Sequence, residues 1–389
     1  MSKIIFMKRT VSLIAAGLLF MLPAISNAQV AITAVPFLQI EPDSRGAGMG
    51  NTGVAIADNA SALYWNPAGL AFQEGNNQAS ITHSNWLANF NVNDLFYDYV
   101  VGKYYIEGIG TIGAHLTYLN LGEQVVTDET GPEPISRFNS YEVAFGASYG
   151  HKFSENFAAG TSLRLIYSSL ASGTSISAQQ VNPGSSVAVD LSFLYRTDPF
   201  AVGGREAKFS FGTNLSNLGP GIQYTDNAQK DPLPTVLRFG WAFDLDLDDE
   251  GINRITIAND ISKIMARTKA EYSSDNQGNT DTTIVASGPL EALFNSWSSF
   301  ERFDGTNTVE VGLMQQFMVG AGIEYWYADQ FALRGGYYFE DPQNGDREYI
   351  TFGAGLRYNF FGVDFSYIKT LESDHPLANT LRFSLLIDF

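Results

Sequence analysis

The last nine residues constrain the fold of this chain more than any other stretch. Apolar and mostly polar side chains alternate along 381–389, and the chain ends on Phe389 itself. A period of two is typical of a β-strand with one apolar face. In a closed membrane barrel the last strand pairs with the first, and its apolar face contacts lipid. The C-terminus therefore favours a transmembrane β-barrel.

The other end of the chain predicts export. A basic stretch (residues 3–9) precedes an apolar run (11–22) that is shorter than the ~20 residues of a spanning helix. Small side chains at 26–28 form a cleavage site, so residues 1–28 are predicted to be a signal peptide and Gln29 the first mature residue. A buried core helix over the apolar run is the alternative, and the complete charge and cleavage pattern disfavours it.

Composition narrows the class further. Charged residues make up only 16% of the chain, against a usual ~25%, while glycine and aromatic residues are abundant. With no cysteine the chain has neither disulfides nor thiolate metal sites, and its four histidines are scattered, so we expect no metal and no cofactor. The chain has 41 acidic and 23 basic residues, so its net charge is strongly negative and nucleic acid is a poor candidate partner.

About fourteen segments alternate with period two, at the ~9–11 residues that a tilted membrane strand needs. They are 79–89, 92–103, 108–120, 139–151, 156–169, 186–196, 207–217, 235–247, 253–262, 317–327, 331–338, 349–359, 361–369 and 380–389. Every second connection is short and the others are mostly long, as in outer-membrane barrels. We predict an all-β antiparallel barrel of about fourteen strands over 79–389. A β-sandwich or a propeller is the soluble alternative, and the aromatic outer faces disfavour it.

The segment 29–78 precedes the first strand and is rich in small residues, so we predict that it folds back into the lumen as a plug. Asn66-Pro67 starts a tight turn, and Trp65 beside it is a large anchor. A turn that locks the plug against the wall and a turn that gates it are equally open interpretations. The candidate plug or gating residues are Arg45, Trp65, Asn66 and Pro67.

The predicted external loops are 121–138, 170–185, 218–234 and the long loop 263–316. Within the last of these, 289–303 begins with Pro289 and has apolar residues at helical spacing, which predicts an amphipathic helix. This helix could be a lid, an anchor in the outer leaflet or a docking face. Aromatic residues dominate binding hot spots, so the candidate partner contacts in these loops are Phe138, Tyr224, Trp297 and Phe300.

Three motifs match catalytic or ligand-binding patterns by letter only. The glycines of 48–53 lack the βαβ unit of a dinucleotide site, and flexible glycine backbone in a plug explains them better. Ser148 lies inside a regular strand rather than on the sharp turn of a nucleophile elbow. The acidic run 244–250 lacks the spacing of a calcium loop. We therefore expect no enzyme.

Several stretches carry a family resemblance: Phe37-Leu38-Gln39-Ile40-Glu41-Pro42-Asp43-Ser44-Arg45-Gly46-Ala47-Gly48-Met49-Gly50, Trp65-Asn66-Pro67-Ala68, 324–327 with 331–337, and 349–367. Together they resemble the PorV family, FadL-like barrels of the type IX secretion system of the Bacteroidetes. The N-terminal motif is shared with PorQ and FadL relatives, and the C-terminal stretch favours PorV. The loop 263–316 departs from the pattern. Phe389 resembles the C-terminal assembly signal of outer-membrane proteins.

The resemblance implies a role without catalysis in the outer membrane of a Gram-negative bacterium, in contact with outer-membrane lipid. Such proteins bind the C-terminal signal domain of cargo leaving the type IX translocon. They hand it to an attachment complex with a PorU-like sortase, PorQ and PorZ. The alternative is a FadL-like channel for the uptake of hydrophobic small molecules. Arginines and acidic residues on the predicted inward faces favour the first role. They can form ion pairs with a plug, whereas a channel for hydrophobic molecules needs an apolar lumen.

Overall fold

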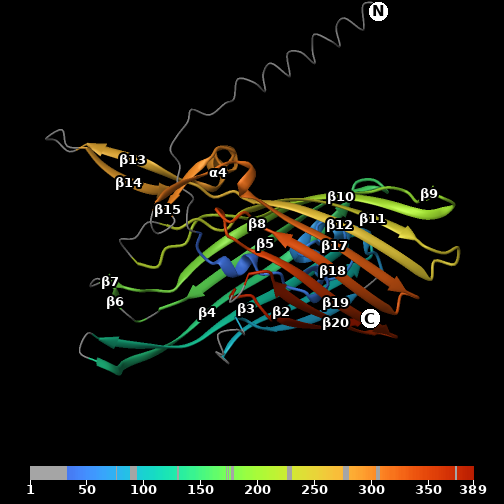
Figure 1. Cartoon of the computed structure of the whole chain (residues 1–389), viewed down its shortest axis with the longest axis horizontal. Helices are drawn as coiled ribbons and strands as arrows, with labels where there is room; N and C mark the ends of the chain where they lie inside the picture. Colours follow the sequence, from blue (N-terminus) through green and yellow to red (C-terminus); the bar gives the residue numbers. More distant parts are fainter. Residues whose placement is uncertain are drawn as a thin grey trace, which may run out of the picture.

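The strands of the computed structural model close into one antiparallel barrel (Figure 1). The structure describes residues 33–75, 77–87, 94–128, 131–171, 173, 175–176, 179–225, 230–274, 280–303, 307–372 and 375–389. The barrel strands are β1 (Gln78–Asn85), β2 (Leu95–Ile106), β3 (Gly110–Asp128), β4 (Gly131–Lys152), β5 (Phe157–Ser169), β8 (Gly184–Arg196), β10 (Arg205–Leu218), β11 (Val236–Asp246), β12 (Asn253–Ile264), β17 (Phe317–Tyr327), β18 (Phe331–Phe339), β19 (Glu348–Tyr358), β20 (Phe361–Thr370) and β21 (Leu381–Asp388).

The barrel closes through ladders between neighbours in sequence and one seam between the chain's ends. β21 pairs with β1, from Asp388 opposite Gln78 to Arg382 opposite Ser84. The short β9 (Phe200–Val202) only extends β10. The predicted 14-strand barrel is therefore confirmed within the described residues, including the pairing of the last strand with the first.

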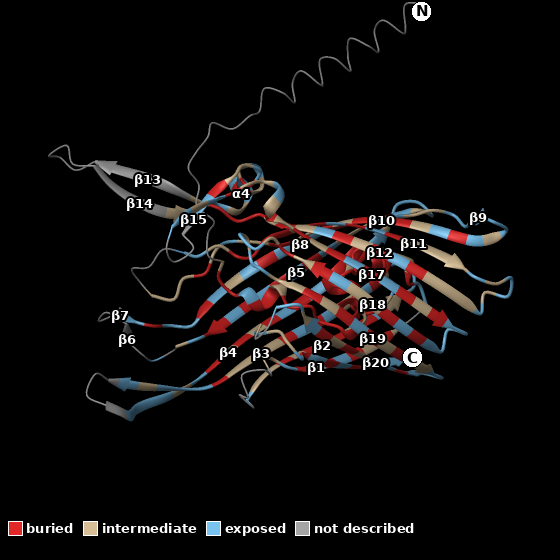
Figure 2. Cartoon of the chain, in the orientation of Figure 1, coloured by how far each residue is buried: buried red, intermediate tan, exposed pale blue. Residues whose placement is uncertain are grey.

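Side chains alternate between the two faces of the wall. In β21 the inward Arg382 and Ser384 are buried, while the outward Phe383 and Leu385 are exposed. The same alternation bands the strands in Figure 2. No helix among the described residues is long and apolar enough to cross a membrane. The exposed apolar bands are the faces that contact lipid in an outer-membrane barrel.

The two ends of the barrel differ. Short turns join the strands at the end that carries β9 and the C-terminus, which is the periplasmic end in this architecture (Figure 1). At the other end β3 and β4 continue past their neighbours as a paired ribbon. The prediction of a loop over 121–138 is therefore wrong. The register of β3 and β4 shifts at Asn120/Glu123, and the two strands then pair again. The backbone N–H and C=O groups beyond the shift therefore still find partners in the neighbouring strand.

The long external loop has structure of its own. It contains the hairpins β13–β14 (Thr268–Ser274, Thr280–Ala286) and β15–β16 (Phe300–Phe303, Thr308–Val311), the helix α4 (Pro289–Asn295), and the 3-10 turn η4 (Met314–Gln316). A smaller hairpin, β6–β7 (Ser175–Ile176, Gln179–Gln180), lies in the connection after β5. The predicted helix begins at Pro289 but ends eight residues early. Phe300 instead pairs with Val311 in a strand.

Residues 33–75 lie inside the barrel, in the short helical turns η1 (Pro36–Gln39), α2 (Ser44–Gly48), α3 (Ala62–Trp65) and η2 (Pro67–Phe72). This luminal segment starts at the external end, where the Ala34 amide donates to the Pro232 carbonyl at 2.9 Å. It leaves at the periplasmic end, where the Asn77 carbonyl accepts from the Phe389 amide at 3.0 Å. The predicted signal peptide, 1–28, falls outside the described residues.

Candidate functional site

The luminal segment rests on glycines of the barrel wall. A Cβ atom on Gly336 of β18 would lie 2.1 Å from the Gly50 nitrogen, and one on Gly320 of β17 would lie 2.2 Å from the Gly50 oxygen. Gly50 itself has a φ of +66°, which favours glycine. The sequence analysis interpreted the glycines of 48–53 as flexible backbone, whereas the structure places them in close contact with the wall. They allow two backbones to touch.

The opposite wall makes the same kind of seat for the Asn-Pro-Ala turn. A Cβ on Gly160 of β5 would lie 2.2 Å from the Ala68 nitrogen. Gly150 of β4 and Gly212 of β10 would meet the Pro67 oxygen at 2.8 Å and the Asn66 side-chain nitrogen at 2.7 Å. The segment is thus in backbone contact with both sides of the wall.

Trp65, Asn66 and Pro67 form the centre of this contact. The Trp65 indole is buried and donates to Asp43 at 2.7 Å. The Asn66 amide nitrogen donates to the carbonyl of Val54 at 2.9 Å, inside the segment, and to a wall carbonyl of β8 at 3.0 Å. Pro67 starts η2, where its missing N–H costs nothing. These contacts fit the locking interpretation of the turn.

Arg45, the fourth predicted plug residue, begins a chain of buried ion pairs. It donates to Glu324 of β17 at 2.7 and 2.9 Å and also pairs with Asp58. Glu324 accepts from Arg334 at 2.6 Å. Arg334 and Arg357 then share Asp364, at 2.7 and 2.6 Å. This Arg45 network joins the luminal segment to β17, β18, β19 and β20.

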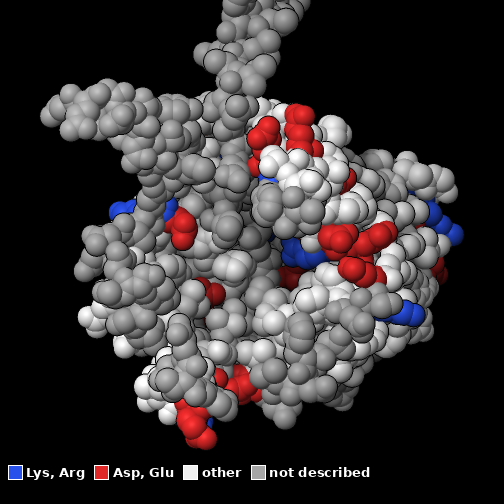
Figure 3. Space-filling view, turned by 60° about the vertical axis from the view of Figure 1, so that its left-hand side comes forward, with Lys and Arg blue, Asp and Glu red and all other residues white. Residues whose placement is uncertain are grey.

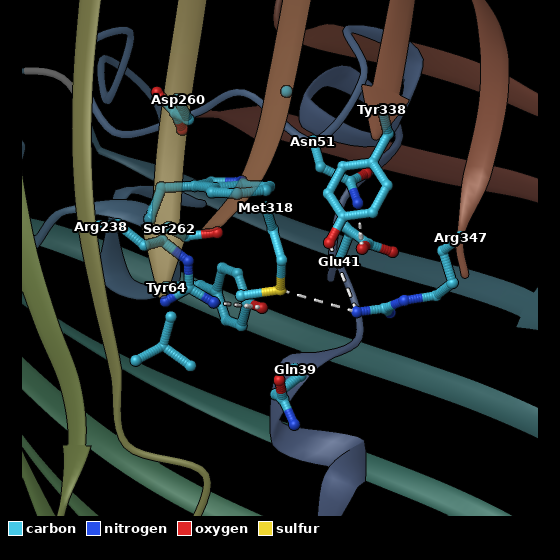
Figure 4. Close-up of a pocket in the computed structure, with 13 residues that line it drawn as sticks. Gln39, Glu41, Asn51, Tyr64, Arg238, Asp260, Ser262, Met318, Tyr338 and Arg347 are labelled. Carbon is cyan, nitrogen blue, oxygen red and sulfur yellow. Dashed lines mark hydrogen bonds between the residues drawn. The ribbon is translucent and has the colours of Figure 1, made fainter. Parts of the chain in front are cut away.

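Small polar cavities flank the luminal segment. A cavity of about 30 Å³, lined by Glu41, Arg238, Asp260 and Arg347 among others, lies between the segment and β11, β12, β17 and β18 (Figure 4). A second, of about 220 Å³, lies beside Arg45 and is lined by Arg196, Lys208 and Asp244 among others. Charged groups that line both spaces suit water rather than a hydrophobic ligand.

The four predicted partner contacts differ in exposure. Phe138 is half-buried on the β3–β4 ribbon. Tyr224 packs into the barrel mouth, where its hydroxyl donates to Ser168 at 2.9 Å. Trp297 is 41% exposed, and its indole donates to the Leu293 carbonyl. Phe300 is only 4% exposed, so the structure does not present its ring to a partner.

Phe300 is buried because the loop folds onto a cation. The Arg267 guanidinium lies 4.7 Å from the centre of the Phe300 ring and donates to the carbonyls of Ser296 and Ser298 at 3.1 and 2.6 Å. Burial lowers the pKa of Arg267 to about 10, which leaves it charged at neutral pH. This cation fixes the root of the long loop.

The exposed apolar residues of the loop are ones that the sequence analysis did not choose. Phe294 on α4 is 77% exposed and Met314 on η4 is 79% exposed, and Leu290 also faces solvent. Leu290, Phe294 and Trp297, at helical spacing on α4 and just after it, form what we call the α4 patch. The helical spacing of Leu290 and Phe294 was visible in the sequence, but which face of α4 would be covered was not. Acidic side chains lie around the hollow at this end of the molecule (Figure 3).

Phe389 follows β21 at the periplasmic end, where its ring is exposed and its amide is hydrogen-bonded to Asn77.

Among the residues that the structure describes, no cluster of three or more His, Asp or Glu side chains is arranged to hold a metal ion.

A comparison with protein families decides the identity of the chain. The profile described as "Type IX secretion system protein PorV" matches residues 24–271, well over half of the sequence. The chain belongs to the PorV family. As a barrel of this family it is an outer-membrane protein of type IX secretion. No curated protein matches its sequence.

Solved structures agree with this fold. The TodX ΔS2S3 mutant monoaromatic hydrocarbon channel is 11% identical and superposes with a TM-score of 0.51 over 90% of this chain and 99% of its own. The toluene transporter TodX of Pseudomonas putida (12% identity, TM-score 0.47, 90% and 98% coverage) is similar. So is a FadL homologue of Pseudomonas aeruginosa (12%, 0.43, 93% and 99%). At these identities the likeness concerns the barrel fold alone.

Proposed function

We propose that this PorV-family barrel binds the C-terminal signal domain of cargo leaving the type IX translocon and hands it to the cell-surface attachment complex. The family match over residues 24–271 is the observation that carries the proposal. The proposed partners are the translocon, the cargo, a PorU-like sortase, PorQ and PorZ. The proposed role is one of binding and transfer, without catalysis.

The luminal segment supports this role because we propose that it acts as a fixed plug. Its backbone touches wall glycines on both sides, and its polar groups are paired with wall residues, as in the bonds from the Gly53 and Val54 amides to Asp260 at 2.8 and 3.0 Å. Moving it would expose unpaired buried groups, each at a cost of ~1–3 kcal/mol. A barrel with such a plug acts through its outer surfaces.

The α4 patch is the proposed contact for cargo. Neighbouring exposed apolar side chains mark interaction sites more often than scattered ones do. Aromatic residues such as Phe294 and Trp297 contribute most of the energy at protein interfaces. Of the four contacts that the sequence suggested, Trp297 stays in the proposal, and Phe294 takes the place of the buried Phe300.

A FadL-like channel for hydrophobic small molecules is the second candidate, favoured by the similarity of the barrel to the TodX channel fold. It requires an apolar lumen through which a ligand can pass. The flanking cavities of about 30 and 220 Å³ are polar, and the segment fills the space between them. These features favour the secretion role.

The test is depletion of the protein in its own host, followed by proteomics of periplasm, cell surface and medium. The proposal expects proteins with type IX signal domains to leave the surface and medium and to accumulate in the periplasm or on the translocon. Complementation with the wild type and with a Phe294→Ala/Trp297→Ala variant shows whether export needs the α4 patch as well as the barrel. Normal export combined with reduced uptake of long-chain fatty acids would instead support the channel.

A further inference from the structure

The two polar cavities of the lumen follow one another along the same part of the inner wall. The cavity of about 30 Å³ is lined by Arg238 of β11 and Asp260 of β12 (Figure 4). The cavity of about 220 Å³ is lined by Asp244 and Thr256 of the same two strands. Because β11 ends and β12 begins at the periplasmic end, we call the first the external-side cavity and the second the periplasmic-side cavity.

Each cavity includes charged side chains that also reach solvent. Arg347, which lines the external-side cavity, has a partly exposed side chain. Lys208 and Arg254, which line the periplasmic-side cavity, are exposed to a greater extent. Charged linings of this kind suit water and small ions. The two cavities are therefore suited to be the hydrated ends of a route along this wall.

An apolar cluster lies between the two cavities, and we call it the apolar septum. It joins buried residues of the luminal segment to buried residues of the wall: Met49, Ala55, Ile56, Ala242 and Ala258. On the inward face of β12, Ala258 lies between Asp260, which lines one cavity, and Thr256, which lines the other. These two lining residues are four positions apart, or about 13 Å along a strand that rises 3.2–3.4 Å per residue.

Glycines of the wall bring the luminal segment into close contact at this level. A Cβ on Gly322 of β17 would lie 2.7 Å from the Met49 Cβ, and one on Gly240 of β11 would lie 2.8 Å from the Val54 Cβ. Gly322 lies between Gly320, which lines the external-side cavity, and a residue of β17 that lines the periplasmic-side cavity. The segment and the wall therefore touch where a column of water would have to pass, and a close-packed apolar region holds no water.

We propose that the apolar septum is the permeability barrier of this barrel, and that water and small inorganic ions are the solutes it stops. An ion that leaves either cavity would have to give up its hydration among methyl and thioether groups, which offer no polar partner in exchange. Hydrophobic constrictions close channels in the same way. The barrier is thus a short layer of packed side chains rather than the whole length of the luminal segment. This inference is independent of cargo transfer.

The test places hydroxyl groups in the septum at almost no change of volume. An Ala242→Ser/Ala258→Ser variant in planar bilayers should raise the time-averaged potassium chloride conductance about tenfold, the rate factor for a barrier lowered by about 1.4 kcal/mol. The matched control is Ala144→Ser/Ala188→Ser, because these wall alanines are equally buried but belong to another apolar cluster. It should conduct like the wild type. Heat-modifiable mobility verifies that each barrel is folded.

A substitution in the luminal segment repeats the comparison from the other side of the septum. Ile56→Thr introduces a hydroxyl group and should also raise the conductance. Ile56→Val keeps the side chain apolar and should leave the conductance low. This pair carries the test even where the serine variant fails to assemble.

A cysteine can locate the path of the extra current, because the natural chain has none. Thr256→Cys, added to Ala242→Ser/Ala258→Ser, places a thiol in the periplasmic-side cavity. A charged methanethiosulfonate adduct on this thiol should remove most of the extra conductance, because it narrows the space through which the ions pass. The same reagent on the serine variant without the cysteine should have no effect.

Three results would overturn the proposal. One is wild-type conductance for Ala242→Ser/Ala258→Ser and for Ile56→Thr in folded barrels. Another is an equal rise in the Ala144→Ser/Ala188→Ser control, because then any polar group beside the segment loosens it. The third is an extra current that the adduct at Thr256→Cys leaves unchanged, which would place the route elsewhere. None of these results depends on cargo export, so they are distinguishable from a failure of the proposed function.

Discussion

The luminal segment and the long external loop are both insertions relative to a bare barrel, but they treat their apolar residues in opposite ways. The segment buries its large side chains, such as Trp65, and pairs its polar groups with the wall. The loop buries Phe300 yet leaves Phe294 and Met314 in solvent. Burial of the first kind stabilises a fold, and exposure of the second kind prepares a surface for a partner. The predictions below test this contrast, in order of their expected effect on barrel stability.

Trp65→Ala should have the largest effect. Removing a buried tryptophan costs about 3–5 kcal/mol, and the Asp43 carboxylate loses its indole donor. We expect a lower free energy of unfolding in urea and more frequent openings in single-channel recordings. Trp65→Phe keeps an aromatic ring but loses the indole hydrogen bond and part of the buried volume, so its effect should be smaller. An unaltered recording for Trp65→Ala would argue against a structural role for the segment.

Arg45→Ala should come next, at about 3 kcal/mol, because breaking a buried ion pair leaves an uncompensated charge. Glu324 keeps Arg334 as a partner, which places the cost at the lower end of the range. The control is Arg254→Ala, which breaks the exposed pair with Asp329 and should cost about 0–1 kcal/mol. Equal urea midpoints for the two variants would contradict the Arg45 network.

Gly336→Ala tests the backbone contact itself. The new Cβ would meet the Gly50 nitrogen at 2.1 Å, so the wall or the segment must move, at about 1–3 kcal/mol. Gly335→Ala is the matched control one residue away, where the nearest atom would be an ordinary 3.7 Å from the Cβ. Proteolysis of the segment in the folded barrel should increase only for Gly336→Ala. Similar protection in both variants would mean that the glycine seat is not needed.

Phe294→Ala with Trp297→Ala should change unfolding by no more than about 0.5 kcal/mol, because both side chains are exposed. Capture of an isolated cargo signal domain should fall at least tenfold, since hot-spot residues each contribute about 2 kcal/mol or more. Phe153→Ala, an exposed aromatic at the periplasmic end, is the control. Unchanged capture would remove the α4 patch from the proposal.

Deletion of Phe389 should leave the stability of the assembled barrel nearly unchanged, because the ring is exposed and one backbone hydrogen bond is lost. We expect slower assembly, measured as the fraction with heat-modifiable mobility during a pulse-chase. Phe389→Tyr keeps an aromatic terminus and should assemble normally. Normal kinetics after the deletion would mean that this residue is no assembly signal.

The barrel was predictable because strand alternation is a local signal. Each outward Phe or Leu is one residue from an inward Ser or Arg, whatever the rest of the chain does. The β3–β4 ribbon was missed because pairing beyond the membrane leaves no apolar face to detect. The short α4 was overestimated because Trp297 and Phe300 also fit helical spacing, and only the tertiary contact with Arg267 decides where Phe300 goes.

The candidate site was less predictable, because its contacts join residues far apart in sequence. Arg45 reaches Glu324 and Gly50 reaches Gly336, and neither pairing leaves a trace in a single sequence. The glycines near Gly50 and those of the wall were visible separately. Without their juxtaposition they suggest flexibility, whereas together they form a close contact.

The close contacts between glycines of the luminal segment and glycines of the wall restrict how related sequences can diverge. A Cβ on Gly48 would lie 3.2 Å from the Gly353 Cα, and one on Gly353 would lie 3.3 Å from the Gly48 Cα, although the two glycines are far apart in the sequence. A side chain gained at one position must be matched by space at the other. Across homologous sequences the luminal segment and strands β17 to β19 should therefore change as pairs.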